Sequence, residues 1–382
     1  MRIAIVTESW LPSVNGMVTR LSATVRELTA RGHEVLVVSV TSTGDYHGAR
    51  VVTMPSFTAR IAYPGQQWGW PSLRFLRIFR EFDPDIVHVV NPAWMGGSAV
   101  FAARVLRRTV VCSYHTDLLA YADFYKLGWL RWLMALLLRT IHNAAHRNLV
   151  TSRHMERVVT RMGFKRVHLW PRGIDADQFA VPRTPREAGA PIEVLSVGRL
   201  AKEKHLESLM TLAATPGIHL TFLGDGPHRA ELEARFASTD ATFAGTLRGA
   251  DLAAAYAAAD VFALPSLTET LGLVLLEALA AGLPIVAAES PASIELLDGC
   301  PAARLYDDAD DPSVVASLAA ELVASATSDD LAAIARDWLG PYSWSTATDA
   351  VLEFYRLART PRAALTVPHP LPAPATPAAN AA

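Results

Sequence analysis

The chain has 382 residues, of which 51% are hydrophobic and 19% charged, a composition that folds and a length that predicts two domains. Its formal net charge of −2 argues against nucleic acid as a partner, because no excess of basic residues is available to neutralise phosphates. The two cysteines, Cys112 and Cys300, lie far apart and outside any CxxC motif, which argues against a disulfide framework or a zinc site and fits a reducing cytoplasm. No apolar run reaches the roughly 20 residues of a membrane-spanning helix, and the N-terminus lacks the pattern of a secretion signal.

Short apolar runs alternate with helical patterns through the first half of the chain. We predict five buried strands and, after the first of them, a helix over 17–31 that Gly32 ends. The runs are RIAIV at 2–6, HEVLVVSV at 33–40, DIVHVV at 85–90, TVVCSYH at 109–115 and NLVTS at 148–152. Continuous apolar strands that alternate with helices favour a parallel sheet covered by helices on both faces.

A polar, proline-rich stretch at 182–191 interrupts this pattern, and we predict that it links two domains. The alternation restarts after it, which predicts a second doubly wound unit of similar size. The predicted domains therefore cover 1–181 and 192–341. A last helix at 342–359 is expected to cross back to the first domain, and the residues at 360–382, rich in Pro and Ala, are predicted to be disordered.

The stretch SLTETLGLVLLEALAAGLPIVA, which starts at Ser266, is almost wholly apolar yet contains Glu269 and Glu277. We predict a loop as far as Leu271, a helix over 272–281 and then a strand. The first-turn N–H groups of a helix have no partner within the helix, so a diphosphate could bind them, with a carboxylate at each end to accept hydrogen bonds from hydroxyls. A nucleotide sugar has this chemistry. The spacing equally allows a solvated Glu269 and a Glu277 that pairs with a nearby arginine.

Two cations follow the first predicted strand of the second unit, in GRLAKEKH. Arg199 and Lys204 lie at the carboxyl end of a strand, where open α/β sheets bind ligands, and could neutralise a diphosphate. The alternative is that Arg199 is a solvated loop charge and that Lys204 begins a helix expected from His205. A second strand-end turn, FLGDGP, more often only reverses the chain.

Together these motifs resemble those of the family-4 retaining glycosyltransferases, which have the GT-B fold. The family's Glu-x7-Glu segment stands here as ETLGLVLLEALAAGLPIV, and its G-R-L-x-x-x-K-G and G-x-G-P motifs stand as GRLAKEKH and GDGP. The loop after the first strand is LPSVNGM, the motif between the domains is RGIDADQF, and YSW precedes the last helix. The resemblance runs from Arg2 to about Arg359. It implies two Rossmann-like, doubly wound domains that face a central cleft, the first for the acceptor and the second for the nucleotide sugar.

Four positions depart from the family pattern. Leu271 replaces the usual Phe and Thr270 the usual Ser, while His205 stands where Gly commonly follows the lysine. Asn15 replaces one glycine of the first loop. None of these changes removes a charged group, so we expect an active enzyme in which they bear on the choice of donor.

The resemblance also implies a role for each matching position. Glu269 would bind hydroxyls of the transferred sugar and Glu277 the ribose, while Arg199 and Lys204 would hold the diphosphate and stabilise the departing nucleotide. His115, at the end of a strand, would face the sugar near the reacting carbon and complete the catalytic set with Arg199, Lys204 and Glu269, although a strand-end histidine is otherwise as often structural. The remaining positions are Gly272, Leu273 and Val274 for backbone N–H groups, Gly16 for close approach of the first helix to the donor, and Asn15, Asp117 and Tyr121 for the acceptor side.

The family retains the anomeric configuration, and the resemblance implies front-side attack by the acceptor hydroxyl while the nucleoside diphosphate departs from the same face. No enzymatic nucleophile is then needed, unlike in retaining hydrolases, and the departing phosphate serves as the base. The resemblance further implies a GDP- or UDP-linked sugar as co-substrate, no other cofactor and no metal. The acidic residues at 307–311 are interpreted as solvated.

Within the family, SYHTDLLAYADFYKLG and LWPRGIDADQF look most like the bacterial branch that glycosylates lipids, which includes GDP-mannose-dependent α-mannosyltransferases and sulfoquinovosyl-diacylglycerol synthases. We therefore expect α-transfer of a hexose, with mannose as the first choice, to a lipid or lipid-linked hydroxyl. A helix over 129–146 would place aromatic residues beside a basic stripe, which suits an anionic surface such as the inner face of the plasma membrane. The alternative is a helix packed in the core with a solvated basic edge.

Three other functions are open to the same sequence. A small-molecule glycosyltransferase would share every motif above and differ only in its acceptor. A nucleotide-binding oxidoreductase is disfavoured because no G-x-G-x-x-G follows any predicted strand. A catalytically inactive binding module is disfavoured because Glu269, Arg199 and Lys204 are all present.

Overall fold

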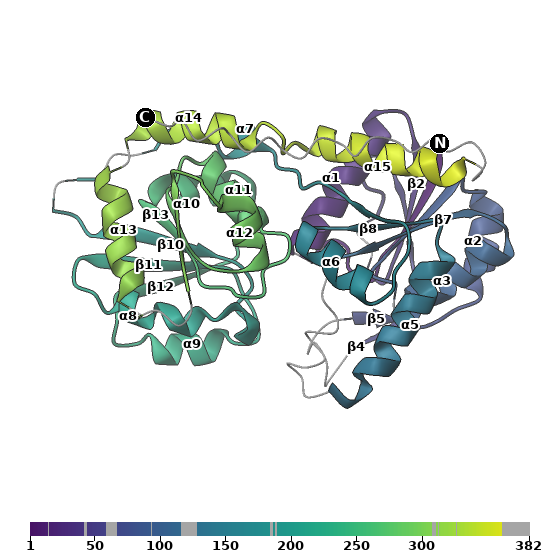
Figure 1. Cartoon of the computed structure of the whole chain (residues 1–382), viewed down its shortest axis with the longest axis horizontal. Helices are drawn as coiled ribbons and strands as arrows, with labels where there is room; N and C mark the ends of the chain where they lie inside the picture. The colour runs from purple at the N-terminus through teal and green to yellow at the C-terminus, as the bar shows by residue number, and fades with distance from the viewer. Residues whose placement is uncertain are drawn as a thin grey trace. The chain divides into compact units, whose positions relative to one another are not determined.

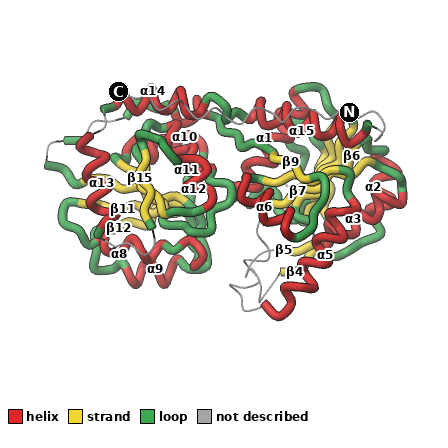
Figure 2. The backbone as a smooth tube through the Cα atoms, in the orientation of Figure 1, coloured by secondary structure: helices red, strands yellow, loops and turns green. Residues whose placement is uncertain are grey.

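The computed structural model describes residues 1–360 apart from 14, 42–43, 59–66, 93, 116–127, 184–185, 188, 308–310, 312 and 326. The predicted tail after Thr360 lies outside these residues. The chain divides into two compact units (Figure 1): one runs from Met1 to Gly173 and includes the helix that begins at Trp344, and the other runs from Ile174 to Ser343. Each unit is built on a parallel sheet, yellow in Figure 2, with helices, red, packed against it.

The first unit contains a seven-stranded parallel sheet in the order β3-β2-β1-β6-β7-β8-β9. Its strands are β1 (Arg2–Val6), β2 (Glu34–Ser39), β3 (Arg50–Thr53), β6 (Ile86–Val90), β7 (Thr109–Tyr114), β8 (Arg147–Val150) and β9 (Val167–Leu169), and a separate hairpin pairs β4 (Ser56–Thr58) with β5 (Gln67–Gly69). Its helices are α1 (Gly16–Ala30), α2 (Arg74–Phe82), α3 (Trp94–Val105), η1 (Gly128–Leu130), α5 (Arg131–Ala144), α6 (Arg153–Arg161) and α15 (Trp344–Arg359). The five strands predicted from apolar runs are confirmed as β1, β2, β6, β7 and β8.

Both faces of this sheet are buried, which is why its central strands are mostly apolar. Alternate residues of β1 supply two separate cores. Ile3 and Ile5 belong to the cluster that includes side chains of α1 and α15, whereas Ala4 and Val6 belong to the cluster that includes side chains of α2 and α3. Successive side chains of a strand point to opposite faces, so burial of both sets requires helices on both sides.

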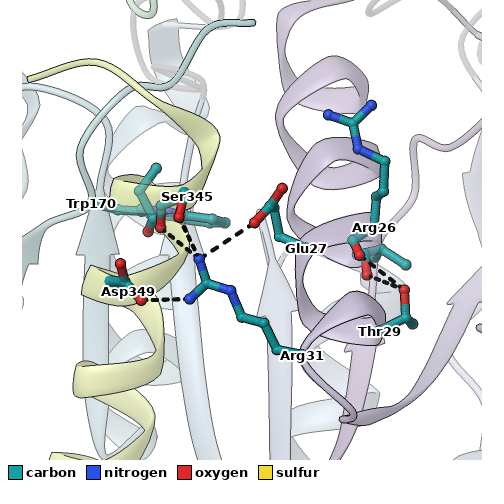
Figure 3. A network of polar contacts seen from close by, with 9 residues as sticks. Arg26, Glu27, Thr29, Arg31, Trp170, Ser345 and Asp349 are labelled. Atoms are coloured by element: carbon teal, nitrogen blue, oxygen red, sulfur yellow. Dashed lines mark hydrogen bonds and ion pairs between the residues drawn. The ribbon is translucent and has the colours of Figure 1, made fainter. Parts of the chain in front are cut away.

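Helix α15 follows the second unit in sequence but packs in the core of the first. Arg31, at the end of α1, donates a hydrogen bond to the Ser345 hydroxyl and forms ion pairs with Asp349 and with Glu27 (Figure 3). The indole N–H of Trp170 donates to the carbonyl of Ala347 at 3.2 Å. Polar contacts at the helix start and apolar burial along its length therefore hold α15 against α1.

The second unit contains a six-stranded parallel sheet in the order β12-β11-β10-β13-β14-β15. Its strands are β10 (Ile192–Val197), β11 (Ile218–Leu223), β12 (Ala241–Gly245), β13 (Val261–Leu264), β14 (Ile285–Ala288) and β15 (Ala303–Tyr306). Its helices are α7 (Ala176–Phe179), η2 (Lys202–Lys204), η3 (Leu206–Leu209), α8 (Met210–Ala213), α9 (Arg229–Arg235), α10 (Gly249–Ala258), α11 (Leu273–Ala280), α12 (Pro291–Leu297), α13 (Val314–Ser325) and α14 (Ser328–Leu339).

One predicted helix of this unit is wrong. The segment expected to form a single helix from His205 instead forms η2, η3 and the short α8. His205 has a φ of 52°, in the left-handed region, and a residue in that conformation interrupts a right-handed helix. No helix in the described part of the chain is long and apolar enough to cross a membrane.

Each sheet has one point where its winding reverses. In the first unit β1 lies between β2 and β6, and in the second unit β10 lies between β11 and β13. Loops on the carboxyl ends of such strand pairs diverge and leave room for a ligand. The predicted fold class, α/β with two doubly wound parallel units, is confirmed, and its two reversal points lead to the loops after β1, β6, β10 and β13.

Candidate active site

Lys204 and Glu269 meet at the reversal point of the second unit. Lys204 ends η2 after β10, Glu269 lies in the loop after the neighbouring strand β13, and the Lys204 Nζ to Glu269 Oε2 distance is 2.7 Å. The two side chains are only 21% and 15% exposed. A solvated Glu269 is therefore excluded, and so is a Lys204 that serves only to begin a helix.

Glu269 is held as a carboxylate. Burial raises its pKa, but the charge of Lys204 and hydrogen bonds from Lys204 and from the backbone of Gly272 and Leu271 outweigh burial, so the pKa lies below its ordinary value. The Gly272 N–H donates to Glu269 Oε1 at 3.1 Å. One oxygen of the Glu269 carboxylate thus contacts the Lys204 ammonium, and the other accepts from the N–H of Gly272 at the start of α11. These two contacts fix the orientation of the carboxylate.

The start of α11 has the geometry of an anion site. Gly272 is its N-cap, with a φ of +65°, a backbone conformation that favours glycine because L side chains rarely adopt it. No acidic residue occupies the first turn. The first-turn N–H groups, including those of Leu273 and Val274, have no partner within the helix and carry the positive end of its dipole.

Arg199 lies in the loop between β10 and η2. Its Nη1 is 3.4 Å from Oε1 of Glu203, whose side chain is 5% exposed. The Glu203 carbonyl in turn accepts a hydrogen bond from the Thr268 hydroxyl at 2.9 Å, next to Glu269. Glu203 thus ties the loop of Arg199 to the loop of Glu269. Sequence reasoning missed it because an acid between two lysines has the pattern of a solvated loop residue.

The GDGP turn after β11 packs directly on the Arg199 loop. A Cβ on Gly224 would lie 1.9 Å from the Gly198 carbonyl oxygen, and a Cβ on Gly226 would lie 2.2 Å from that of Leu200. Both contacts are impossible for any other residue. The turn therefore does more than reverse the chain: it supports the backbone on either side of Arg199.

Glu277 lies on α11, and its carboxylate accepts a hydrogen bond from the Tyr256 hydroxyl at 2.8 Å. Burial raises its pKa to about 7, although the bond from Tyr256 acts in the opposite direction. The expected alternative, a pairing with arginine, is wrong within the described residues. Tyr256 is fully buried on α10 between Phe179 and Phe262. It was missed because its place in an alanine-rich helix indicates only packing.

His115 follows β7 in the first unit and is 5% exposed. Its backbone N–H donates to Asn91 Oδ1 at 2.7 Å, and its Nε2 lies 2.9 Å from the Ser113 hydroxyl. Burial, together with the nearby charge of Arg20, lowers the pKa of His115 well below its ordinary value. The imidazole is therefore neutral at physiological pH.

Asn15 and Gly16 begin α1. Asn15 is the N-cap and accepts a hydrogen bond from the Val18 N–H at 2.9 Å, and Gly16 is the first helical residue. Asp117 and Tyr121 lie outside the described residues. The predicted donor-side residues of α11 and of the loops after β10 and β13 are thus brought together, whereas the acceptor-side set is described only in part.

Arg20 is a further residue that sequence reasoning missed. It is fully buried, its guanidinium lies 4.3 Å from the centre of the Trp170 ring, and it donates to the carbonyls of Trp170 and Pro171. Burial and the neighbouring charge of Arg172 lower its pKa. An arginine on an amphipathic helix is normally solvated, so no pattern in the sequence distinguishes this one.

Two doubly wound units, with cations and a helix start gathered at the reversal point of one of them, fit a nucleotide-sugar glycosyltransferase of the GT-B class. A family model described as Glycosyltransferase Family 4 matches residues 14–178, and one described as Glycosyl transferases group 1 matches residues 178–316. The chain belongs to glycosyltransferase family 4, as its motifs indicated.

The chain is similar to two curated relatives and shares its fold with one solved structure. It is 37% identical to a GDP-mannose-dependent alpha-mannosyltransferase of Mycolicibacterium smegmatis, over 80% of this chain and 84% of the relative. It is 33% identical to the sulfoquinovosyl transferase SQD2 of Arabidopsis thaliana, over 92% of this chain and 72% of the relative. The structure of Anabaena Alr3699/HepE in complex with UDP and glucose matches with a TM-score of 0.74 and 17% identity, over 94% of this chain and 100% of that one, which shows a shared fold.

Proposed function

We propose that the protein transfers mannose from GDP-mannose to a hydroxyl of a lipid or lipid-linked acceptor, with retention of the anomeric configuration. The observation that carries the proposal is the convergence of Lys204, Glu269 and the start of α11 at one reversal point. Mannose and GDP are supported by the name of the Mycolicibacterium smegmatis relative. The lipid acceptor is supported by a surface of the first unit that is described below.

On the donor side, the diphosphate binds the first-turn N–H groups of α11 and the cations Arg199 and Lys204. Glu269 accepts hydrogen bonds from the transferred sugar, and Glu277 accepts them from the ribose. The bond between the anomeric carbon and the diphosphate oxygen breaks as the acceptor oxygen bonds to the same face of that carbon. The acceptor proton passes to the departing phosphate, so catalysis rests on positioning and on stabilisation of the diphosphate charge.

The proposal predicts which donor the enzyme prefers. Purified protein is expected to transfer hexose from GDP-mannose to a total lipid extract faster than from UDP-glucose or other UDP-sugars, with the product identified by mass spectrometry. EDTA is expected to leave the rate unchanged, because the cations of the site are arginine and lysine. A preference for a UDP-sugar would overturn the mannose assignment, and no transfer from any of these donors to the lipid extract would overturn the proposed function.

Support for a lipid acceptor comes from an exposed apolar surface on η1 and α5. This α5 surface consists of Trp129 at 73% exposure, Trp132 at 70%, Leu133 at 46%, Leu136 at 52% and Leu137 at 47%. The alternative of a helix packed in the core is therefore wrong for these residues. The surrounding sequence, 128–147, contains three arginines and no acidic residue. Aromatic and aliphatic side chains beside basic ones suit the anionic cytoplasmic leaflet of a membrane.

Vesicle binding tests this surface. The protein is expected to co-sediment with vesicles that contain anionic lipid more strongly than with zwitterionic vesicles, and added salt should weaken the binding. Replacing both Trp129 and Trp132 by Ala should weaken it by about tenfold or more, since each burial of a large apolar side chain is worth about 1.5–3 kcal/mol. Ile294→Ala removes a side chain 45% exposed on α12 of the second unit and is the matched control. No binding by the wild type would favour a soluble small-molecule acceptor instead.

A further inference from the structure

A chain of three buried hydrogen bonds joins α15 to His115. The Tyr355 hydroxyl lies 2.7 Å from His88 Nδ1, and His88 Nε2 lies 2.9 Å from the Ser113 hydroxyl. The Ser113 hydroxyl lies 2.9 Å from His115 Nε2. His88 is on β6 and Ser113 on β7, so the chain passes from the last helix through two neighbouring strands of the sheet to the residue that follows β7.

The direction of this chain follows from the Tyr355 end. Tyr355 has no exposed surface, and His88 Nδ1 is the only hydrogen-bond partner of its hydroxyl within the described residues. If the hydroxyl accepted a hydrogen bond from His88, its own proton would be buried without an acceptor. Leaving a buried donor unsatisfied is costly, so Tyr355 donates and His88 Nδ1 accepts.

Each later member of the chain then has one favourable state. His88 is neutral, because burial and the charge of Arg20 lower its pKa to about 3, so an accepting Nδ1 puts its single proton on Nε2. The His88 Nε2–H group therefore donates its hydrogen bond to the Ser113 hydroxyl oxygen. The Ser113 hydroxyl has one proton of its own, which is left to donate to His115 Nε2. His115 is also neutral, so its proton lies on Nδ1.

We propose that Tyr355 is a positioning residue that acts through His88 and Ser113 to hold His115 in the Nδ1–H tautomer. His115 then presents an N–H donor, and its Nε2 is occupied by Ser113. The tautomer stands on the hydrogen bonds alone; its consequence for transfer rests on the proposed function and on the role near the transferred sugar that the family resemblance implies for His115. There His115 donates a hydrogen bond to a sugar oxygen and does not take the proton of the acceptor, which leaves that proton to the departing phosphate.

Histidine nitrogen NMR on the full chain tests the tautomer without any substrate, so the result holds even if the proposed transfer fails. A His115→Gln variant assigns the signal. In the wild type we expect a protonated Nδ1 and an unprotonated Nε2 for His115. Tyr355→Phe keeps the ring and removes the hydroxyl, and it should allow the Nε2–H tautomer of His115 to appear. A wild-type His115 with its proton on Nε2, or a tautomer unchanged by Tyr355→Phe, would overturn the proposal.

Kinetics test the consequence for the reaction. Tyr355→Phe and Ser113→Ala break the chain at different links, and each should lower kcat by about tenfold, the scale of one lost hydrogen bond. Affinity for the free nucleoside diphosphate, which has no sugar, should stay unchanged. Ser39→Ala is the matched control, because Ser39 is equally buried in the same sheet and its hydroxyl has no partner among the described residues. A kcat unchanged in both chain variants, or equally lowered in Ser39→Ala, would reject a role for the chain in transfer.

Discussion

Lys204→Ala is expected to lower turnover by about a hundredfold or more, which is the scale observed when one preorganised group that stabilises transition-state charge is lost. Lys204 is the cation nearest to Glu269, at 2.7 Å, and it lies beside the start of α11 where the diphosphate is proposed to bind. Its removal takes away a positive charge as the nucleotide departs. It also removes the charge that keeps the pKa of Glu269 low. Steady-state kcat with the preferred donor measures the effect.

Lys202→Ala is the matched control. It changes a lysine of the same short helix, but Lys202 is 61% exposed and pairs with Glu231 outside the proposed site. We expect its turnover to equal that of the wild type, and Arg199→Ala to resemble Lys204→Ala. Melting curves of all three variants show whether any loss comes from folding. A Lys204→Ala enzyme within a few-fold of wild type, or one no worse than Lys202→Ala, would remove Lys204 from the site.

Glu269→Gln and Glu277→Gln are expected to have different effects. Glu269→Gln should reduce transfer strongly and leave the affinity for free nucleoside diphosphate nearly intact, because that ligand has no sugar for Glu269 to bind. Glu277→Gln should weaken the nucleoside diphosphate and the full donor alike. A hydrogen bond to a charged group is worth roughly 1.5–3 kcal/mol, so each loss of affinity should be about tenfold to a hundredfold. Calorimetric titration with GDP and UDP measures both variants.

The pH dependence of nucleoside diphosphate binding gives a second readout for Glu277. Its pKa is raised to about 7, so the carboxyl is protonated below that pH and ionised above it. Only the ionised form accepts hydrogen bonds from both ribose hydroxyls through both oxygens. Affinity should therefore rise by about tenfold between pH 6 and pH 8, as for one titrating group with this pKa.

The terminal phosphate of the ligand titrates in the same range, so the wild-type profile alone does not isolate Glu277. The Glu277→Gln variant has no titrating carboxyl at this position, so the pH dependence of its affinity comes from the phosphate. The difference in pH dependence between wild type and Glu277→Gln is then the contribution of Glu277. Equal effects of Glu269→Gln and Glu277→Gln on nucleoside diphosphate binding, or identical pH profiles in wild type and Glu277→Gln, would contradict the two assigned roles.

Much of the fold could be predicted because strand and helix patterns are local. The run at 2–6 predicted β1 correctly, since a strand buried on both faces must be apolar at every position, as Ile3, Ala4 and Ile5 are. The prediction of one helix from His205 failed because the spacing of apolar residues gives no information on backbone conformation. His205 has a positive φ, which interrupts a helix, and its residue type does not reveal this. The hairpin of β4 and β5 was not predicted either, because its strands are three residues each, too short to show a period.

Local patterns were enough to predict most of the strands and helices, and the loops that carry Arg199, Lys204 and Glu269, because each depends on residues close together in the chain. Which side chains meet is set by the way the strands and helices pack together. Lys204 contacts Glu269, 65 residues away in the chain, because the strand order makes β10 and β13 neighbours. The residue pattern within either strand does not predict that order. Tyr355 reaches His88 across 267 residues because α15 packs on the sheet of the first unit. Long-range pairings of this kind are set by how buried faces pack together, which is a property of the whole fold.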